Sequence, residues 1–174
     1  NYSRVLRQNE DWSALAGYDT FQTKSFFDPI KYIPLSDDGS FWMSFGGQVR
    51  FRLERWNNYN FDREFNDTFL LTRLRLHTDI HIGKYLRFFA EMKSAFSTDR
   101  DLPGGRRTLD VDELDLQQAF ADIMIPAGDS GKLTLRPGRQ MLLLGKQRLV
   151  SPLDWSNTMR TWQGVQGIFD WHNW

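Results

Sequence analysis

The sequence contains no cysteine, which excludes thiol catalysis, cysteine-based zinc sites and a disulfide framework, and leaves the redox compartment open. It also lacks an excess of charge of either sign. Lys and Arg together number 22, Asp and Glu together number 22, and the formal net charge is zero. Because no global positive field draws the chain to nucleic acid, we expect no nucleic-acid partner. Any electrostatic attraction must come from local groups of charges.

Long apolar runs are missing as well. No stretch approaches the roughly 18 to 20 consecutive apolar residues that a membrane-spanning helix requires, which excludes a helical membrane protein. The first residues show neither the positive nor the apolar segment of a signal peptide, so we expect a chain that is either cytosolic or already processed. What the sequence does have is an aromatic content of 15% at a mean hydropathy of −0.55. Its rings are therefore interleaved with polar residues.

The chain divides into two parts with different patterns. Residues 1–40 are predicted to form an extended lead-in, because prolines and the turn-like sequence at 37–39 interrupt any regular element. Residues 41–174 are predicted to hold strands, since apolar and polar residues alternate there with the two-residue period of a β-strand. Six strands are expected, over residues 43–54, 70–82, 86–96, 115–125, 132–139 and 163–171.

The connections between these strands alternate in length. A tight turn with Gly83 joins residues 70–82 to residues 86–96, and residues 126–131 form a second short turn, whereas the other connections are long. Short turns at one end and long loops at the other are typical of transmembrane β-barrels. Pro137 has no N–H to donate, which predicts an edge, a bulge or a strand end at that position.

A soluble antiparallel sheet with one face on a core alternates in the same way. A soluble or periplasmic β-sheet module that binds carbohydrate is therefore the alternative, and a structural barrel with a plugged lumen is a third interpretation. Three features favour the membrane: strand lengths near the roughly 9 to 11 residues that cross it, the loop asymmetry, and aromatic residues at strand ends that resemble interfacial girdles. These aromatic residues are Phe41, Trp42, Trp56, Tyr59, Tyr85 and Trp171.

Several short motifs follow one another in a fixed order. Leu133-Thr-Leu-Arg-Pro-Gly-Arg-Gln-Met is followed by Gly145-Lys-Gln-Arg-Leu-Val-Ser and then by Asn157-Thr-Met-Arg-Thr-Trp-Gln-Gly-Val. Upstream lie Lys31-Tyr-Ile-Pro-Leu, Phe45-Gly-Gly-Gln-Val-Arg-Phe-Arg and Leu116-Gln-Gln-Ala-Phe-Ala-Asp. This ordered set, from about residue 31 to residue 168, resembles the N-terminal part of the alginate-export outer-membrane porins.

The resemblance implies an all-β fold, an antiparallel transmembrane β-barrel of about 18 strands in the outer membrane of a Gram-negative bacterium. About six strands are visible here, and open sheet edges do not persist in lipid, so we expect an N-terminal part of a longer integral outer-membrane protein. In such a protein the lead-in, residues 1–40, is expected to lie in the periplasm or in the barrel lumen. The resemblance also implies alginate export, that is, polysaccharide transport without catalysis or cofactor. The expected partners are outer-membrane lipid and an anionic carbohydrate of the uronic-acid type, or a small anion, which passes an anion-selective lumen by passive diffusion.

On the strand faces assigned to the lumen, cations outnumber anions. A guanidinium group is always charged and binds carboxylates through two parallel hydrogen bonds, so a ladder of arginines offers successive weak sites to a polyuronate. The acids either keep these arginines apart and mobile or lock them into salt bridges of the wall. For each arginine, a wall salt bridge without contact to the solute is the alternative to a role in the path. The candidate path residues are Arg50, Arg52, Arg73, Arg75, Arg87, Lys93, Arg136 and Arg139, together with Glu54, Asp79, Glu91 and Asp122.

Metal sites and catalytic sites are not expected. His77 and His81 would lie about 13 Å apart along a strand, too far to share a metal ion, and are predicted to be solvated in the lumen. The acidic cluster at residues 110–115 lacks the spacing of a calcium loop and is predicted to be a solvated loop. No nucleophile elbow, phosphate loop or zinc motif occurs in the sequence.

Overall fold

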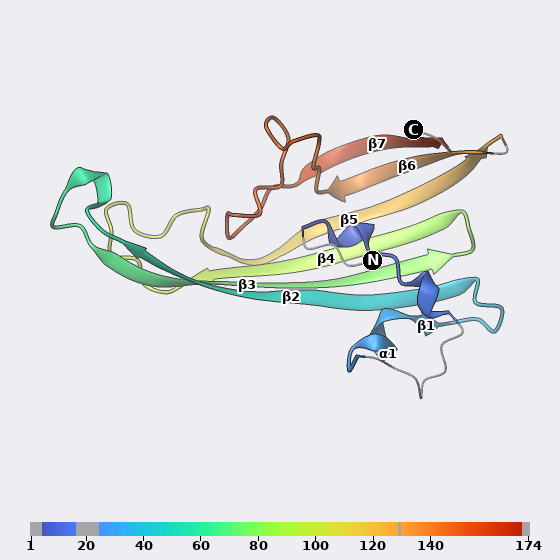
Figure 1. Cartoon of the computed structure of the whole chain (residues 1–174), viewed down its shortest axis with the longest axis horizontal. Coiled ribbons are helices and arrows are strands. Elements are labelled where there is room, and N and C mark those ends of the chain that lie inside the picture. The colour runs from blue at the N-terminus through green and yellow to red at the C-terminus, as the bar shows by residue number, and fades with distance from the viewer. Residues whose placement is uncertain (1–4, 17–24, 129, 172–174) are drawn as a thin grey trace.

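The computed structural model describes residues 5–16, 25–128 and 130–171, and these residues build one antiparallel sheet (Figure 1). Its seven strands lie side by side in their order along the chain, which confirms the expected all-β, antiparallel fold. They are β1 (Ile33–Pro34), β2 (Phe41–Trp56), β3 (Asp67–Ile82), β4 (Leu86–Ser97), β5 (Asp112–Ala127), β6 (Gly131–Gln140) and β7 (Trp162–Trp171). The helical elements are η1 (Arg7–Asn9), η2 (Ser13–Leu15), α1 (Asp28–Lys31) and η4 (Tyr59–Phe61).

No helix within the described ranges is long and apolar enough to cross a membrane. Parts of the predicted organisation lie outside the described residues: 1–4 and 17–24 of the lead-in, and 129 and 172–174 of the strand region.

The six predicted strands correspond to β2 through β7, but the structure has a seventh strand that was not predicted. The extra strand, β1, pairs only Ile33 with Met43 and Pro34 with Trp42. Two residues are too few to show an alternation, and a proline argues against a strand, so the sequence pattern did not reveal it.

A strand end was one of the outcomes predicted for Pro137, but Pro137 does not end its strand. It lies inside β6, where it pairs with Val165 of β7. On the other side of β6, the pairing with β5 is recorded on both sides of Pro137 but not at Arg136 or Pro137 themselves. The neighbouring Gly138 has a φ of 134°, and a side chain there would meet the carbonyl oxygen of Ala119 at 2.3 Å. The missing N–H is thus accommodated by a local gap in one ladder.

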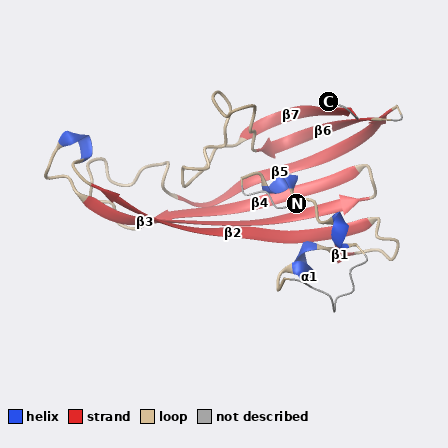
Figure 2. Cartoon of the chain, in the orientation of Figure 1, coloured by secondary structure: helices blue, strands red, loops and turns tan. Residues whose placement is uncertain are grey.

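The short turns and the long loops gather at opposite ends of the sheet (Figures 1 and 2). Gly83 and Gly128, with φ of 57° and 66°, take the left-handed conformation in the two short turns at one end. This end is called the turn end below. The connections 57–66, 98–111 and 141–161 lie at the other end, called the loop end. The predicted alternation of short and long connections is therefore present, although Pro126 belongs to β5 rather than to the turn.

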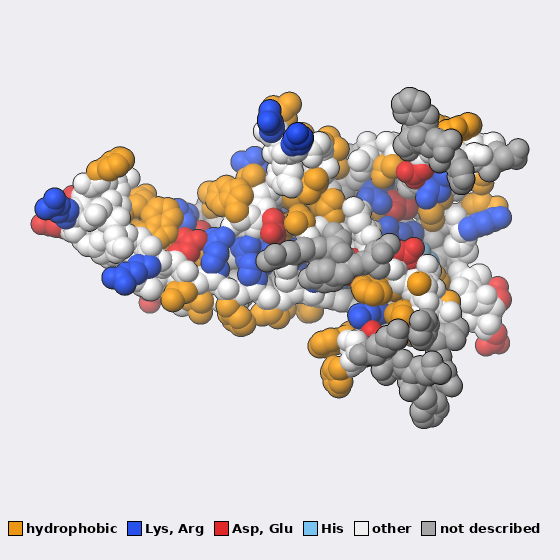
Figure 3. All heavy atoms as spheres, in the orientation of Figure 1, with side chains coloured by type: hydrophobic (Ala, Val, Ile, Leu, Met, Phe, Trp, Pro, Cys, Tyr) orange, Lys and Arg blue, Asp and Glu red, His pale blue; other side chains and the backbone are white. Residues whose placement is uncertain are grey.

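Alternation gives the sheet two faces of opposite character. One face, the outer face, exposes apolar side chains: Val49 is 59% exposed, Phe51 69% and Leu53 70%. The other, the inner face, buries polar and charged side chains, and Arg73 and Arg75 are 0% exposed. In Figure 3 apolar side chains line the edge of the molecule along β2, whereas charged side chains gather over the middle of the visible face. The polarity is the reverse of a water-soluble sheet, which places apolar residues inside.

A small apolar cluster covers the loop end of the inner face. Phe69, Leu71 and Leu102 are buried there, and Trp56 and Tyr59 pack against them. These two aromatic residues are therefore not part of an exposed girdle, contrary to the prediction from their position at strand ends.

Trp42 departs from the girdle prediction in the same way, because it is buried and stacks on His81 with ring centroids 3.9 Å apart. Tyr85 and Trp171, in contrast, are exposed as a girdle would require.

Candidate substrate path on the inner face

Strand register brings like charges together across the inner face. Arg50 of β2 lies directly opposite Arg73 of β3, and Arg75 of β3 lies directly opposite Lys93 of β4. Like charges in directly opposed positions repel each other. The face therefore needs negative or partly negative groups between these cations, and the structure provides them differently at its two ends.

Toward the turn end, carboxylates of the strands themselves pair with the arginines. Arg87 of β4 lies 2.7 Å from Asp79 of β3 and 3.4 Å from Asp122 of β5. Asp122 also binds Arg136 of β6 at 2.6 Å. These four residues form a chain of ion pairs across four neighbouring strands, in which acids and cations alternate from Asp79 in β3 to Arg136 in β6.

The centre of the face holds the most deeply buried ion pair. Arg75 donates from Nε and Nη2 to the carboxylate of Glu91, with the closest contact at 2.9 Å, and both side chains are fully buried. Gln118 of β5 donates to the same carboxylate at 3.5 Å. A buried charge requires such a partner, because its transfer from water is otherwise unfavourable by several kcal/mol.

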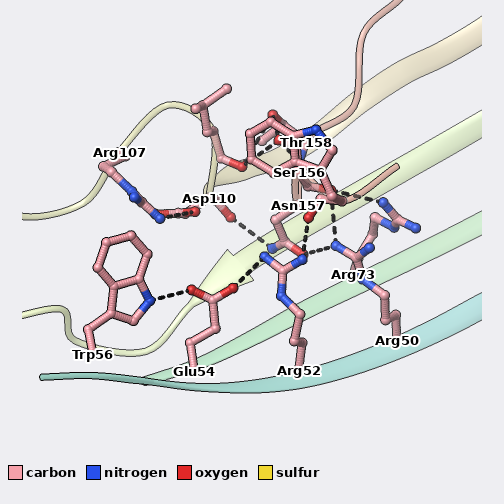
Figure 4. A network of polar contacts seen from close by, with 12 residues as sticks. Arg50, Arg52, Glu54, Trp56, Arg73, Arg107, Asp110, Ser156, Asn157 and Thr158 are labelled. Atoms are coloured by element: carbon pink, nitrogen blue, oxygen red, sulfur yellow. Dashed lines mark hydrogen bonds and ion pairs between the residues drawn. The ribbon is translucent and has the colours of Figure 1, made fainter. Parts of the chain in front are cut away.

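Toward the loop end, the connection between β6 and β7 supplies the negative groups (Figure 4). Asp154 binds Arg73 at 2.7 Å, and its main-chain carbonyl accepts from Arg50 at 2.6 Å. Arg52 binds Glu54 at 2.8 Å and donates to the main-chain carbonyl of Trp155. Arg50 and Arg73 are thus held by a segment more than eighty residues away in the chain, which strand periodicity alone does not reveal.

The remaining two predicted cations lie between β4, β5 and β6. Lys93 binds Asp112 at 2.7 Å and lies 3.9 Å from Asp115, which in turn binds Arg139 at 2.6 Å. Arg139 also donates to the hydroxyl of Thr161. Its contact with Asp115 places Arg139 on the inner face with the other candidate cations.

The N-terminal segment lies against the same face nearer the turn end. Arg7 binds Glu10 and donates to the carbonyl of Gly47 at 2.6 Å. Two of the candidate cations donate to main-chain carbonyls of this segment: Arg75 to Val5 at 3.2 Å and Arg87 to Gln8 at 2.6 Å. Gln8 further contacts Gln118 and the carbonyl of Met141, which fixes the segment across β2 to β6.

The structure therefore brings the predicted candidate residues together on one face, where ion pairs hold most of them and main-chain carbonyls and the amide of Asn157 hold Arg50. Their role in transport stays a prediction. Several participants were not predicted as site residues, among them Gln118, Asp154 and Asn157. Asp112 and Asp115, which the sequence placed in a solvated loop, belong to this group as well. Asn157 opens one of the sequence motifs, and this was the only signal that could have identified it.

The histidines and the acidic cluster differ from their predictions. His77 is buried and stacks on Phe89 at 5.4 Å, and His81 stacks on Trp42, so neither is freely solvated. A Cβ at Gly46, opposite His77, would lie 2.6 Å from its ring, so the missing side chain makes room for it.

In the acidic cluster, Asp112 and Asp115 belong to β5, and Asp110 is buried against Arg107 at 2.6 Å. The hydrogen bond to Asp110 raises the pKa of Arg107. Every one of these three carboxylates has a basic partner. Among the described residues no group of His, Cys, Asp and Glu could hold a metal ion.

Outside the strands, one carboxylate is held unusually acidic. In the connection between β1 and β2, Asp38 accepts from the hydroxyls of Ser36 at 2.5 Å and Ser40 at 2.8 Å and from the main-chain N–H of Ser40 at 3.1 Å. These hydrogen bonds, the one from Ser36 foremost, lower the pKa of Asp38 from 3.8 to about 2.

Comparison with known proteins bears on the identity of the sheet. The family model described as Alginate export matches residues 41–174, which comprise most of the chain and all of β2 to β7. No curated protein and no solved structure matches the chain.

Proposed function

The chain belongs to the alginate-export family, and from this premise we propose that its sheet is part of an outer-membrane barrel wall that passes anionic polysaccharide by passive diffusion. The family is one of outer-membrane β-barrel porins for polysaccharide export, which are transport proteins rather than enzymes. The single observation that carries the proposal is the reversed polarity of the sheet, with apolar residues on the outer face and charges on the inner face.

The outer face supports a position in lipid. Its exposed apolar residues extend across neighbouring strands, from Val49 and Phe51 in β2 to Leu76 in β3, Phe88 in β4 and Val165 in β7. β2 and β3 each span 16 residues, more than the roughly 9 to 11 that cross the hydrocarbon region. A water-soluble carbohydrate-binding module would leave this band in contact with water, where large apolar patches are unfavourable.

The charged side chains of the inner face support an anionic solute, and their exposure is the basis on which we choose the cations that would meet it. The side chains of Arg52 and Arg139 are each 30% exposed, whereas those of Arg73 and Arg75 are 0% exposed. A passing carboxylate exchanges most easily with the accessible guanidinium groups, and such contacts must be weak for release to occur. We therefore place the solute contacts at Arg52 and Arg139, and treat Arg75 with Glu91 as part of the wall.

The N-terminal lead-in belongs in this proposal as a lumenal segment. Its contacts with Gly47, Arg75 and Arg87 all lie on the inner face of the sheet. Of the two positions expected from the sequence, periplasm or lumen, these contacts support the lumen for the segment around η1.

The test is the reversal potential of the full-length protein in a planar bilayer under a salt gradient, with an oligouronate added to one side. We expect an anion-selective current that the oligouronate blocks. Arg52→Glu and Arg139→Glu, singly and together, should reduce or reverse the selectivity.

Arg63→Glu makes the same change of charge in the exposed connection between β2 and β3 and serves as the control, which should leave the selectivity near that of the wild type. Unchanged selectivity in the double variant would refute the assigned path. A protein that stays folded and dissolved without detergent would favour the carbohydrate-binding module instead.

A further inference from the structure

Part of the connection between β6 and β7, residues 153–159, turns back over the inner face, where Ser156, Asn157 and Thr158 lie above the arginines of β2 and β3 (Figure 4). We call this segment the inner-face loop. It starts and ends at Leu153 and Met159, whose φ values of 53° and 61° are in the left-handed region. Non-glycine residues adopt that conformation in only a few per cent of cases, so its presence at both ends defines two sharp turns of the main chain.

Asn157 supplies the central contacts. Its side chain is fully buried. The Nδ2 group donates to the main-chain carbonyls of Thr72 in β3 at 3.1 Å, Phe96 in β4 at 3.1 Å and Asp110 at 2.8 Å. Its Oδ1 atom accepts from Arg50 of β2 at 3.1 Å. One amide side chain thereby fixes the loop to three neighbouring strands and to the β4–β5 connection.

The main chain of the loop adds a second set of contacts. Its carbonyl oxygens accept hydrogen bonds from four cations that the strands present on the inner face. The pairs are Arg50 with Asp154 at 2.6 Å, Arg73 with Ser156 at 3.1 Å, Lys93 with Thr158 at 2.6 Å, and Arg52 with Trp155.

We propose that the inner-face loop is a fixed constriction of the passage and that Asn157 is the positioning residue that holds it there. This inference rests on the proposed function, because it takes the inner face as the wall of a lumen. A segment anchored on that face occupies part of the cross-section and sets the largest solute that passes. The contacts on three strands make it a permanent part of the wall rather than a mobile gate.

The same contacts divide the cations of the inner face by role. Arg50, Arg73 and Lys93 are the less accessible cations and direct donors at oxygen atoms of the loop, so their charge serves to seat it. Arg52 also donates to the loop, at the carbonyl of Trp155, but 30% of its side chain is exposed, so it can still meet a solute. Arg139 has no loop carbonyl among its partners in the described residues and remains partly exposed beside the loop. The loop thus determines size, while the accessible cations determine charge preference.

The inference is tested by releasing the inner-face loop and measuring two quantities, the exposure of the loop to a thiol reagent and the size of the pore. Asn157→Ala removes every hydrogen bond of the Asn157 side chain at once, and Asn57→Ala, in the exposed β2–β3 connection, is the matched control. Because the chain has no cysteine, Ser156→Cys introduces a reporter at a position that is only 2% exposed. Labelling of this cysteine by a membrane-impermeant thiol reagent should accelerate roughly 100-fold in the Asn157→Ala background, as expected for the loss of about three hydrogen bonds.

Pore size is measured on the same full-length variants by single-channel conductance and by the largest neutral sugar that permeates proteoliposomes. We expect higher conductance and a larger permeating sugar for Asn157→Ala, with Asn57→Ala equal to the wild type. Asn157→Asp, which keeps the size of the side chain but loses its N–H donors, should change both readouts in the same direction and guards against a general loss of folding.

A released loop, shown by fast labelling, with unchanged conductance and sugar limit would overturn the constriction. Slow labelling in folded Asn157→Ala protein would overturn the anchoring role of Asn157. Absence of any current in the wild type would instead refute the proposed transport function, so the two failures are distinguishable.

Discussion

Arg50 and Arg73 lie directly opposite each other on adjacent strands, and Asp154 from a distant connection lies between them in the hydrogen-bond network. The Oδ1 atom of Asp154 binds Arg73 at 2.7 Å, while its main-chain oxygen accepts from Arg50 at 2.6 Å. Two opposed guanidinium groups would repel each other without it. The acid that makes this arrangement stable therefore comes from the loop, not from the sheet.

Asp154→Asn should destabilise the protein for this reason. Arg73 is fully buried, but Asp154 keeps a third of its side chain exposed. We therefore expect the free energy of unfolding to fall by about 1 to 2 kcal/mol, less than when a partner is removed from a wholly buried ion pair. Urea titration in detergent micelles measures it. Asp170→Asn, which removes the partner of Lys132 in an exposed pair, should cost less than about 0.5 kcal/mol. Equal effects of the two variants would contradict the special role of Asp154.

The pair formed by Arg75 and Glu91 predicts a larger effect. Because both side chains are fully buried, Glu91→Gln should cost about 3 to 5 kcal/mol of unfolding free energy, since it leaves a buried charge without its counterion. The double variant Arg75→Met, Glu91→Leu should recover most of this loss. Glu64→Gln, in an exposed loop, is the control. If the double variant were as unstable as the single one, the pair would not be the source of the effect.

The outer face makes a prediction that separates lipid from water. Val49→Arg places a charge in the middle of β2 on the exposed apolar face and should cost about 2 to 4 kcal/mol in a bilayer. Leu149→Arg, at a 98% exposed position in the long connection before β7, should stay within about 0.5 kcal/mol of the wild type. Unfolding in lipid vesicles measures both. A harmless Val49→Arg would place this face in water.

Asp38 gives a prediction about pH. The hydrogen bonds from Ser36 and Ser40 lower the pKa of its carboxyl from 3.8 to about 2. A lowered pKa in the folded state means that the carboxylate stabilises the turn above about pH 3.8 and that this contribution is lost as the pH falls through about 2. The carboxyl resonance of Asp38, followed by NMR, should titrate near 2, and Ser36→Ala should move the midpoint toward 3.8. A midpoint that Ser36→Ala does not change would rule out this cause.

The sequence was sufficient for the strands and their faces but not for the partners of the charges. The two-residue period places Arg73 and Arg75 on one face whatever the register, so that face is predictable. Which acid binds each of them depends on the register with β4 and on the path of the β6–β7 connection. The register with β4 determines the pairing of Arg75 with Glu91. The path of the β6–β7 connection determines the pairing of Arg73 with Asp154.

Asn157 shows the limit most clearly. Its motif was visible in the sequence, but nothing local to residues 153–159 indicates that they turn inward. That conformation depends on carbonyl groups of β3, β4 and the β4–β5 connection, which lie 47 to 85 residues away in the chain. The short strand β1 was missed for a similar reason, because only its contact with β2 defines it.

The unbroken match between strand order and chain order has a consequence for how the sheet assembles. Each strand finds its hydrogen-bonding partner in the stretch of chain that comes next, so the sheet can grow by one hairpin at a time. The entropy lost in closing each connection is small where the turn is short, and the longest connection, 141–161, comes late in the sequence. Each added strand therefore satisfies the backbone polar groups along one edge of the strand before it, so that only the two outermost strands keep an open edge, which the interior of a bilayer does not tolerate.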